Sequence, residues 1–432
     1  MSRPRGFKDL AGERVGVWGL GVEGRDVCEV LEQVGAVVVA VDDAAVDFPN
    51  ALVTSEGGFE ALSECDLVIK SPGIPRRRAD VLRLEESGVL VTSATAIWLA
   101  GTDRNLVIGV TGTKGKSTTT SLITFMLRAC GVKAKSAGNI GVTPFRSLDA
   151  PDTWTVLEVS SFQATDITDA PAIVVLTSLG EDHIDWHGSI EQYRRDKLQL
   201  TRAEGFHHTV VPDDVDLALH RSEIGGELLI VPETDPELAE LLGLIGTHNA
   251  RNVALALRTS ALALHRPVDE VREAAIVAAR DFSPLPGRLT LVHRAHVDGH
   301  AIDFIDDGLA TNPLPVVAAA RSFASRPLAL IVGGFDRGVD YTPLVEGVAE
   351  LGETLTLIVM GDAGQRIADA TLAYTPKLHI VAASDLADAV HHAVGTLEHG
   401  GVVLFSPGAP SFDHYRNWEE RSAHFTALVA RY

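Results

Sequence analysis

The chain has 432 residues, of which 46% are apolar and 22% charged, so it can bury sizeable cores and resembles neither disordered nor fibrous proteins. Acidic residues outnumber basic ones, 58 to 37, and the formal charge of -21 argues against a nucleic-acid binder that relies on a general positive field. The three cysteines form no CxxC pair, and no apolar run approaches the roughly 18 residues of a membrane span. We therefore expect a cytoplasmic protein without disulfides, structural zinc or a membrane partner.

Short β-branched runs followed by helix-compatible stretches recur along the chain. This alternation is typical of βαβ units, so we expect an α/β fold with mainly parallel sheets. Turn-rich stretches near residues 103 and 285 divide the chain into three predicted domains, 1–102, 103–284 and 285–432. The predicted strands are Val15–Trp18, Val37–Val41, Leu67–Ile69, Leu106–Val110, Ile173–Leu176, Leu328–Val332, Leu355–Met360 and Val402–Phe405.

Near the N-terminus, a predicted strand runs into Gly19-x-Gly21-x-x-Gly24, and acidic Asp42 ends the next strand. Such a turn can hold a nucleotide, but βα turns also use glycines for helix–strand packing, and these residues alone leave both interpretations open. A polar loop, Ser71-Pro72-Gly73, follows another strand of the same unit. Both loops would open on the same edge of a parallel sheet, where ligands bind.

The strongest signal is Gly112-Thr113-Lys114-Gly115-Lys116-Ser117-Thr118, a glycine loop between an apolar strand and a helix predicted to begin near Ser117. The glycines let backbone N–H groups surround phosphate oxygens, Lys116 supplies positive charge, and the Ser117 hydroxyl can reach Mg²⁺. Val110 stands where a standard phosphate loop has its first glycine. The strand and helix around the loop still predict an ATP-phosphate site.

Two polar segments follow strands downstream: Glu158 to Gln163, and Asp182-His183-Ile-Asp185-Trp-His187. Their carboxylates and imidazole could hold Mg²⁺ beside ATP. A zinc hydrolase built on His183, Asp185 and His187 is a competing interpretation, because Mg²⁺ prefers oxygen ligands. The upstream phosphate loop favours ATP chemistry.

Other polar residues are less specific. Lys197 lies on a charged helical stretch, which by itself predicts a solvated surface lysine. Asn249 opens an alanine-rich helix, either as a cap or as a contact to a ligand. In the last third, three loops that follow strands would rim one crevice, and Arg337 in one of them suits a carboxylate.

In this order, the segments resemble the Mur ligase family of peptidoglycan precursor synthesis over nearly the whole chain. The resemblance implies a Rossmann-like N-terminal domain for a UDP substrate, a central P-loop ATPase domain, and a Rossmann-like C-terminal domain that admits an amino acid. Within the family the chain is similar to members that add glutamate to UDP-N-acetylmuramoyl-L-alanine through an acyl phosphate. The motifs that carry the resemblance are Gly112–Ser117, Glu158–Gln163, Asp182-His183, His248–Asn252, Leu285–Arg288, Asp307–Asn312 and Ser406–Phe412.

The resemblance also implies roles for individual residues. Lys116 would stabilise the transferred phosphoryl group, Ser117, Glu158 and His183 would hold Mg²⁺, and Lys197 would become a carbamate that supports the metal. The implied ATP contacts are Gly112, Thr113, Lys114, Gly115, Lys116, Ser117, Thr118, Asn249, Arg288 and Asp307. The implied UDP-substrate contacts are Leu20, Gly21, Val22, Asp42, Ser71, Pro72, Gly73, Asn139, Ser160, Ser161 and Gln163, and the implied glutamate contacts are Arg337, Ser411 and Trp418.

The chain departs from the common D-glutamate-adding members: Leu309 and Arg337 stand where they have lysines, and Gly287 stands where they have histidine. The stretches Ile69–Ile74, Asp185–Gly188 and Arg195–Leu198 look like the rarer members that add L-glutamate, which a partner epimerase later inverts. We therefore expect L-glutamate, with D-glutamate as the alternative, and a monomeric enzyme. A folylpolyglutamate-synthetase-like ligase, a metal hydrolase and a non-catalytic nucleotide-binding module are the remaining rivals.

Overall fold

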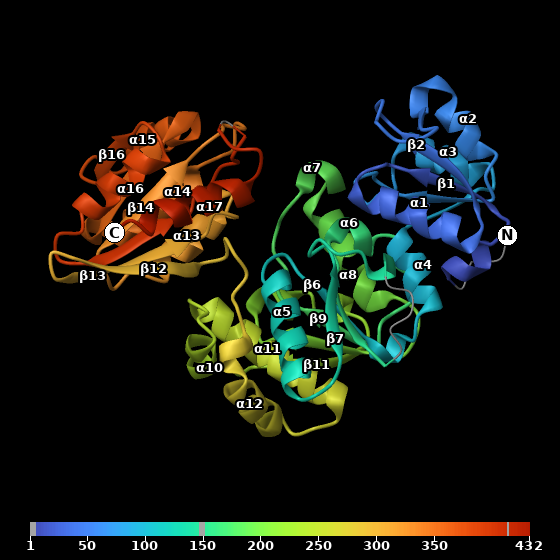
Figure 1. The fold of residues 1–432 in the computed structure, drawn as a ribbon, viewed down its shortest axis with the longest axis horizontal. Helices are drawn as coiled ribbons and strands as arrows, with labels where there is room; N and C mark the ends of the chain where they lie inside the picture. Colours follow the sequence, from blue (N-terminus) through green and yellow to red (C-terminus); the bar gives the residue numbers. More distant parts are fainter. Residues whose placement is uncertain (1–5, 147–151, 413) are drawn as a thin grey trace. The chain divides into compact units, whose positions relative to one another are not determined.

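The computed structural model describes residues 6–146, 152–412 and 414–432, and the chain forms two compact units (Figure 1). The first comprises Met1–Asp235 and Arg251–Ala279, and the second Pro236–Ala250 and Arg280–Tyr432. Two sheets lie in the first unit and one in the second. The prediction of an α/β fold with mainly parallel sheets is confirmed. Within the described ranges, no helix is long and apolar enough to cross a membrane.

The first sheet has the strand order β3-β2-β1-β4-β5, and every pair is parallel. Both faces are buried, since Val15 and Val17 of β1 pack into one apolar cluster and Trp18 into another. This explains the near-continuous apolar strands. The elements are β1 (Arg14–Trp18), α1 (Val22–Val34), β2 (Val37–Asp42), β3 (Leu52–Val53), α2 (Phe59–Ser63), β4 (Leu67–Lys70), α3 (Ala79–Glu86), β5 (Leu90–Thr92) and α4 (Ala94–Gly101).

The second sheet has the order β11-β10-β9-β6-β8-β7 and is also parallel. The strands are β6 (Val107–Thr111), β7 (Ala134–Gly138), β8 (Trp154–Glu158), β9 (Ile173–Leu176), β10 (His208–Pro212) and β11 (Glu227–Val231). The helices that follow in the chain are α5 (Lys116–Ala129), α6 (Ser161–Ala164), α7 (Ile184–His187), α8 (Ile190–Arg202), α9 (Val215–Leu219), α10 (Pro236–Leu241), α11 (Thr247–Leu264) and α12 (Val268–Val277), of which α10 and the first residues of α11 belong to the second unit.

One apolar core joins the two sheets of the first unit. Val17 of β1 belongs to the same buried cluster as Val107 of β6 and Leu157 of β8. Phe7 and Phe145 also meet there, with ring centroids 5.4 Å apart. Because this core is continuous, the two sheets and the loops at their ends belong to one compact unit.

The third sheet, in the second unit, has the order β12-β13-β17-β14-β15-β16. All pairs are parallel except β12 with β13, which is antiparallel. The edge strand β12 was not among the strands predicted from sequence. The elements are β12 (Thr290–Val297), β13 (His300–Asp306), α13 (Pro313–Arg321), β14 (Leu328–Gly333), α14 (Thr342–Leu351), β15 (Leu355–Met360), α15 (Gly361–Tyr374), β16 (His379–Ala383), α16 (Leu386–Gly395), β17 (Gly401–Phe405) and α17 (Trp418–Val429).

Each sheet lies within one of the three predicted domain ranges, the first at residues 14–92, the second at 107–231 and the third at 290–405. The boundaries at 102/103 and 284/285 themselves stay predictions.

Candidate active site

The phosphate loop between β6 and α5 has a backbone that requires glycine. Gly112 has φ +146° and Gly115 φ +86°, and a Cβ atom at Gly112 would lie 2.1 Å from Thr177 Oγ1. α5 begins at Lys116, one residue before its predicted start, and its N-cap residue is Gly115 in the left-handed conformation. A helix N-terminus that directly follows a glycine loop is the arrangement that binds phosphate.

Neighbouring segments hold this loop in shape. The Thr113 hydroxyl lies 2.8 Å from the Tyr193 hydroxyl, and Lys114 Nζ pairs with Asp182 Oδ2 at 3.1 Å. Thr118 is half-buried in the first turn of α5. Thr113 and Lys114, both predicted as ATP contacts, therefore have contacts of their own that stabilise the loop.

Two lysines approach the same carbonyl of the phosphate loop. Lys116 Nζ donates to the Gly112 carbonyl at 2.8 Å, and Lys197 Nζ, which comes from α8, donates to it at 2.9 Å. The residue Lys197 is only 2% exposed, so the prediction of a solvated surface lysine is wrong. Burial, reinforced by the positive charge of Lys116, holds the pKa of Lys197 well below its usual value. A lowered pKa favours the neutral form of this amine, which is a nucleophile.

Glu158, at the end of β8, is suited to a metal ion. The residue is 1% exposed, and its Oε1 atom accepts a hydrogen bond of 2.8 Å from Asn139 Nδ2. Its buried Oε2 atom has no hydrogen-bond partner among the described residues. Ser117 is buried in the first turn of α5. A buried carboxylate oxygen with no donor is expensive unless a cation binds there, so these residues fit Mg²⁺.

His183 stands apart from His187, its partner in the zinc-hydrolase interpretation. The His183 side chain is 53% exposed, and its ring lies 4.9 Å from that of Phe162. His187 is buried, with Nδ1 2.7 Å from Asp196 Oδ2 and Nε2 3.0 Å from Ser161 Oγ. Because both ring nitrogens of His187 are engaged, the structure gives the zinc-hydrolase interpretation no support.

The predicted muramoyl-facing residues Ser160, Ser161 and Gln163 form a tightly bonded loop before and within α6. Ser160 and Gln163 make a reciprocal capping box, in which Gln163 Oε1 accepts from Ser160 N at 3.0 Å. A hydrogen bond from Gln163 reaches Glu23 of α1. Burial raises the pKa of Glu23 to about 7, although that hydrogen bond lowers it. These hydrogen bonds stabilise the loop's conformation, and Glu23 is an acidic neighbour that the sequence patterns did not reveal.

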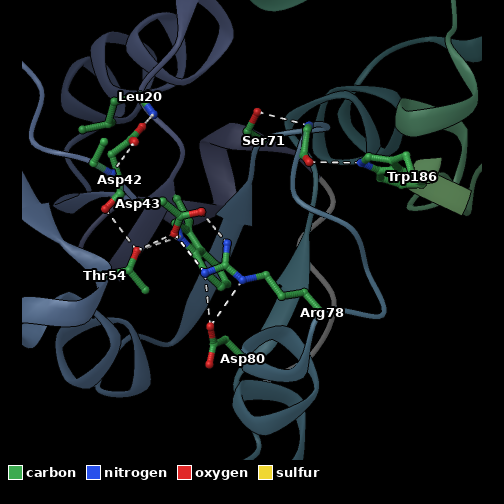
Figure 2. A network of polar contacts seen from close by, with 11 residues as sticks. Leu20, Asp42, Asp43, Thr54, Ser71, Arg78, Asp80 and Trp186 are labelled. Carbon is green, nitrogen blue, oxygen red and sulfur yellow. Dashed lines mark hydrogen bonds and ion pairs between the residues drawn. The ribbon is translucent and has the colours of Figure 1, made fainter. Parts of the chain in front are cut away.

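The turn between β1 and α1 uses its glycines in two ways. A Cβ atom at Gly24 would lie 2.0 Å from the Gly19 carbonyl oxygen, whereas one at Gly21 would meet open space. Gly24 is thus a packing requirement, and Gly21 leaves room for a ligand. Asp42 fixes the turn, because its Oδ2 atom accepts from Leu20 N at 2.7 Å (Figure 2), and Val22 is 75% exposed beside it.

The second loop of this sheet, Ser71-Pro72-Gly73, lies beside the first. Ser71 N donates to the carbonyl of Trp18 at the end of β1, at 2.7 Å. Trp186 from α7 donates its indole N–H to the Gly73 carbonyl at 3.1 Å (Figure 2).

A cleft of about 620 Å³ opens in the same sheet's loop region, with Asp43, Phe59 and Arg78 in its lining. Arg78 pairs with Asp43 (Figure 2). Its guanidinium also lies over the Trp18 ring, 4.8 Å from the ring centroid. Asp43, which directly follows the predicted contact Asp42, thus lines a polar cleft.

Three of the predicted ATP contacts lie in the second unit, where each has local contacts of its own. Asn249 is 4% exposed and donates to the Ile245 carbonyl at 2.8 Å. The Asp307 carboxyl accepts from Ser406 Oγ at 2.7 Å, and burial raises its pKa to about 7. The charge of half-buried Arg288 acts on that carboxyl and lowers its pKa.

The three predicted glutamate contacts lie on loops or helix starts of the same unit. Exposed Arg337 donates to the Thr311 carbonyl at 3.3 Å, and Ser411 is 3% exposed. The Trp418 ring packs so closely on Gly287 that a Cβ atom there would lie 2.4 Å from ring atom Cζ3. Gly287, which stands where the D-glutamate-adding members have histidine, therefore makes room for Trp418.

Arg421 was missed from sequence. It is 1% exposed and donates to the carbonyls of Pro410, Ala409 and Gly308. A lone arginine on a helix carries no sequence signal of such burial, and it ties together two of the three loops predicted to rim the crevice.

Comparison with known proteins agrees with this geometry. Residues 110–221 match the family described as Mur ligase middle domain. The chain is 39% identical to a protein of Micromonospora sp. named UDP-N-acetylmuramoyl-L-alanine--L-glutamate ligase, with 98% of each chain covered. It is 34% identical to a protein of the same name from Xanthomonas euvesicatoria pv. vesicatoria, over 98% of this chain and 96% of the relative.

Among solved structures, UDP-N-acetylmuramate-alanine ligase MurC from Thermotoga maritima has the same fold. The TM-score is 0.56 at 16% identity, over 97% of this chain and 99% of that one. The glycine loop, the fold and the full-length relatives lead to one conclusion: the chain belongs to the Mur ligase family.

Proposed function

We propose that the chain joins L-glutamate to UDP-N-acetylmuramoyl-L-alanine in an ATP-dependent ligation. The observation that carries this proposal is the meeting of two lysine amines, Lys116 Nζ and Lys197 Nζ, at the Gly112 carbonyl of the phosphate loop. The positive charge of Lys116 there suits phosphoryl transfer, in which negative charge spreads over the transferred oxygens, and the buried Lys197 amine lies at the same carbonyl. The relatives named as L-glutamate ligases support this substrate over D-glutamate.

The reaction follows from the chemistry of a carboxylate. An amine cannot usefully displace oxide or hydroxide from it, so an oxygen of the alanyl carboxylate first attacks the γ-phosphorus of ATP, and the bond from that phosphorus to the β,γ-bridging oxygen breaks, releasing ADP. The glutamate nitrogen then attacks the acyl-phosphate carbon, and the carbon–oxygen bond to phosphate breaks as the nitrogen loses a proton. Lys116 stabilises the oxygens of the group in transfer.

Ser117, Glu158 and His183 would hold Mg²⁺, which would neutralise charge on the phosphates. In its deprotonated form, which the lowered pKa favours, the Lys197 amine adds to CO₂ and loses a proton, and the resulting carbamate would supply a further anionic oxygen donor. This role is supported by the burial of Lys197 and by the buried Glu158 oxygen that lacks a donor. Bicarbonate-free buffer should lower turnover by the wild type, and added bicarbonate should restore it.

The remaining predicted roles are part of the proposal. The loops Leu20–Val22 and Ser71–Gly73 with Asp42 contact the UDP group, and Asn139 with the Ser160–Gln163 loop contacts the muramoyl part. Asn249, Arg288 and Asp307 contact ATP, and Arg337, Ser411 and Trp418 contact glutamate. The enzyme works as a monomer in the cytoplasm, where ATP is supplied, and an epimerase inverts the added L-glutamyl residue.

One assay tests the proposal. Purified protein is supplied with UDP-N-acetylmuramoyl-L-alanine, ATP and Mg²⁺, and phosphate release is measured with L-glutamate and with D-glutamate. We expect L-glutamate to be used much faster. Equal or reversed rates would refute the stereochemical claim, and no ATP turnover with either enantiomer would refute the ligase itself.

A further inference from the structure

The last two residues of the short helix α7 contact two different loops of the candidate site. Trp186 donates its indole N–H to the Gly73 carbonyl at 3.1 Å, as Figure 2 shows beside Ser71. His187 Nε2 lies 3.0 Å from the Ser161 hydroxyl oxygen. Adjacent residues of one turn thus hold a loop of the first sheet and a loop of the second.

The second ring nitrogen of His187 is held by a carboxylate on α8. Its side chain is fully buried, and Nδ1 lies 2.7 Å from Asp196 Oδ2 on α8. Burial raises the pKa of Asp196, but hydrogen bonds from His187 and Arg77 lower it below its usual value. In the neutral imidazole, a proton on Nδ1 that faces this carboxylate leaves Nε2 to accept the Ser161 O–H.

Arg77 connects the same carboxylate to the first sheet's loop. Its guanidinium donates to Asp196 Oδ2 and to the His187 carbonyl, both at 3.1 Å. Arg77 follows the Ser71–Gly73 loop closely in sequence. Its contacts with Asp196 and His187, together with the bond from Trp186 to Gly73, therefore hold this loop against α7 and α8.

Aromatic packing further restrains Trp186 and His187. The Phe162 ring, within the second sheet's loop, lies 4.6 Å from the Trp186 ring and 5.5 Å from the His187 ring. Trp186 and His187 pack edge to face at 4.5 Å. Contacts of this kind limit rotamer changes in all three side chains.

Ser161, His187 and Asp196 have the order of a hydrolytic triad, but they do not have its accessibility. The residue Ser161 is 3% exposed, and its hydroxyl lies at the buried start of α6. A nucleophile must reach its substrate, so a positioning role suits this group better than hydrolysis.

We propose that Trp186 and His187 form a brace that fixes the spacing between the Ser71–Gly73 loop and the Ser160–Gln163 loop. The inference rests on the proposed function, in which the first loop contacts the UDP end of the substrate and the second the muramoyl end. A ligand that contacts both loops gains its full affinity only when the loops are held at the right separation. A fragment that contacts one loop does not need the brace.

The test compares the whole substrate with its UDP fragment. His187→Asn keeps a donor near Asp196 but cannot reach Ser161, and Trp186→Phe keeps the ring and removes the N–H donor to Gly73. In calorimetric titrations, each variant should bind UDP-N-acetylmuramoyl-L-alanine about tenfold more weakly than the wild type, the effect of one lost hydrogen bond, and bind UDP equally well. In turnover, KM for this substrate should rise while kcat changes less than twofold.

Two further variants serve as controls. Ser161→Ala removes the same bond as His187→Asn, but Ser161 is also a proposed muramoyl contact, so its single variant can lose more affinity. If the two residues act through their shared bond, adding His187→Asn to Ser161→Ala should weaken binding no further. His220→Asn removes a comparable histidine–carboxylate hydrogen bond, to Glu223 at 2.8 Å, outside the brace, and should change neither affinity.

The outcomes distinguish a brace from general damage to the protein. Equal losses for UDP and for the whole substrate would show general damage and overturn the brace, as would unchanged binding of both. Wild-type protein that binds UDP but not the muramoyl substrate would overturn the proposed function, and the brace with it. If His187→Asn does not fold, Trp186→Phe gives the same comparison.

Discussion

Replacing Asp166 with asparagine should strongly destabilise the first unit. Lys70 Nζ at the end of β4 lies 2.6 Å from Asp166 Oδ2, and both side chains are fully buried. Arg76 pairs with the other oxygen, Oδ1, at 2.8 Å, and its side chain is 36% exposed. Asparagine removes the negative charge and leaves the Lys70 ammonium in the interior.

The magnitude follows from this geometry. At 2.6 Å and an effective dielectric constant of about 20, the attraction between Lys70 and Asp166 is about 6 kcal/mol. Desolvation costs several kcal/mol for each ion, so the intact pair contributes little net stability. Losing one partner forfeits the attraction and keeps the desolvation of the other. We therefore expect Asp166→Asn to lower the free energy of unfolding by about 3–5 kcal/mol.

Lys70→Met is the matched comparison. It removes the ammonium while Asp166 keeps its bond to the partly exposed Arg76, so the loss should be only about 1–2 kcal/mol. The double variant Lys70→Met/Asp166→Asn should be more stable than Asp166→Asn alone, because the uncompensated charge is gone.

Urea unfolding followed by tryptophan fluorescence measures these differences, since Trp18 is buried in the same sheet. Amide hydrogen exchange in β4 provides a local check on the same variants. A loss below about 1 kcal/mol for Asp166→Asn, or a larger loss for Lys70→Met, would contradict the reasoning from an uncompensated buried charge.

Three further changes test other parts of the molecule. Lys116→Ala should lower kcat by at least about a hundredfold while calorimetry shows nearly unchanged binding of the UDP substrate, because it removes a charge from the phosphate loop; lost binding would contradict this division. Burial raises the pKa of Asp307 from 3.8 to about 7, so the stability from its neutral carboxyl is complete below about pH 4 and is lost as the pH rises through about 7. Asp307→Asn should therefore flatten the fall in urea midpoint between about pH 5 and about pH 8, and an unchanged slope would argue against this sign. Gly287→Ala should destabilise the second unit by about 1–3 kcal/mol more than Gly299→Ala, because both glycines have positive φ but only the first would strike Trp418; equal thermal shifts would contradict the clash.

Local sequence determined the parts of the site that depend on neighbours in the chain. The phosphate loop was predictable because Gly112 and Gly115 need positive φ, and Lys116 starts the helix that follows. Parallel strands were predictable because a strand buried on both faces is apolar throughout, as β6 and β14 are.

Contacts between distant segments had no signal of this kind. The charged helix around Lys197 by itself predicts a surface lysine, and only the family resemblance implied another role, yet the fold buries Lys197 against Gly112, 85 residues earlier in the chain. Lys70 finds Asp166 across 96 residues, and His187 meets Ser161 across 26. Burial, and with it the protonation state of an amine or the partner of an imidazole, depends on which segments pack together.

The sequence by itself therefore determined the layered α/β architecture, the phosphate loop and the family to which the chain belongs. Tertiary structure alone decided that Lys197 carries a buried amine with a lowered pKa, that Trp186 and His187 join two loops, and that Gly287 makes room for Trp418. The physical reason is that backbone conformation and apolar periodicity are set by adjacent residues, whereas desolvation and hydrogen-bond partners are set by residues brought together only when the sheets pack.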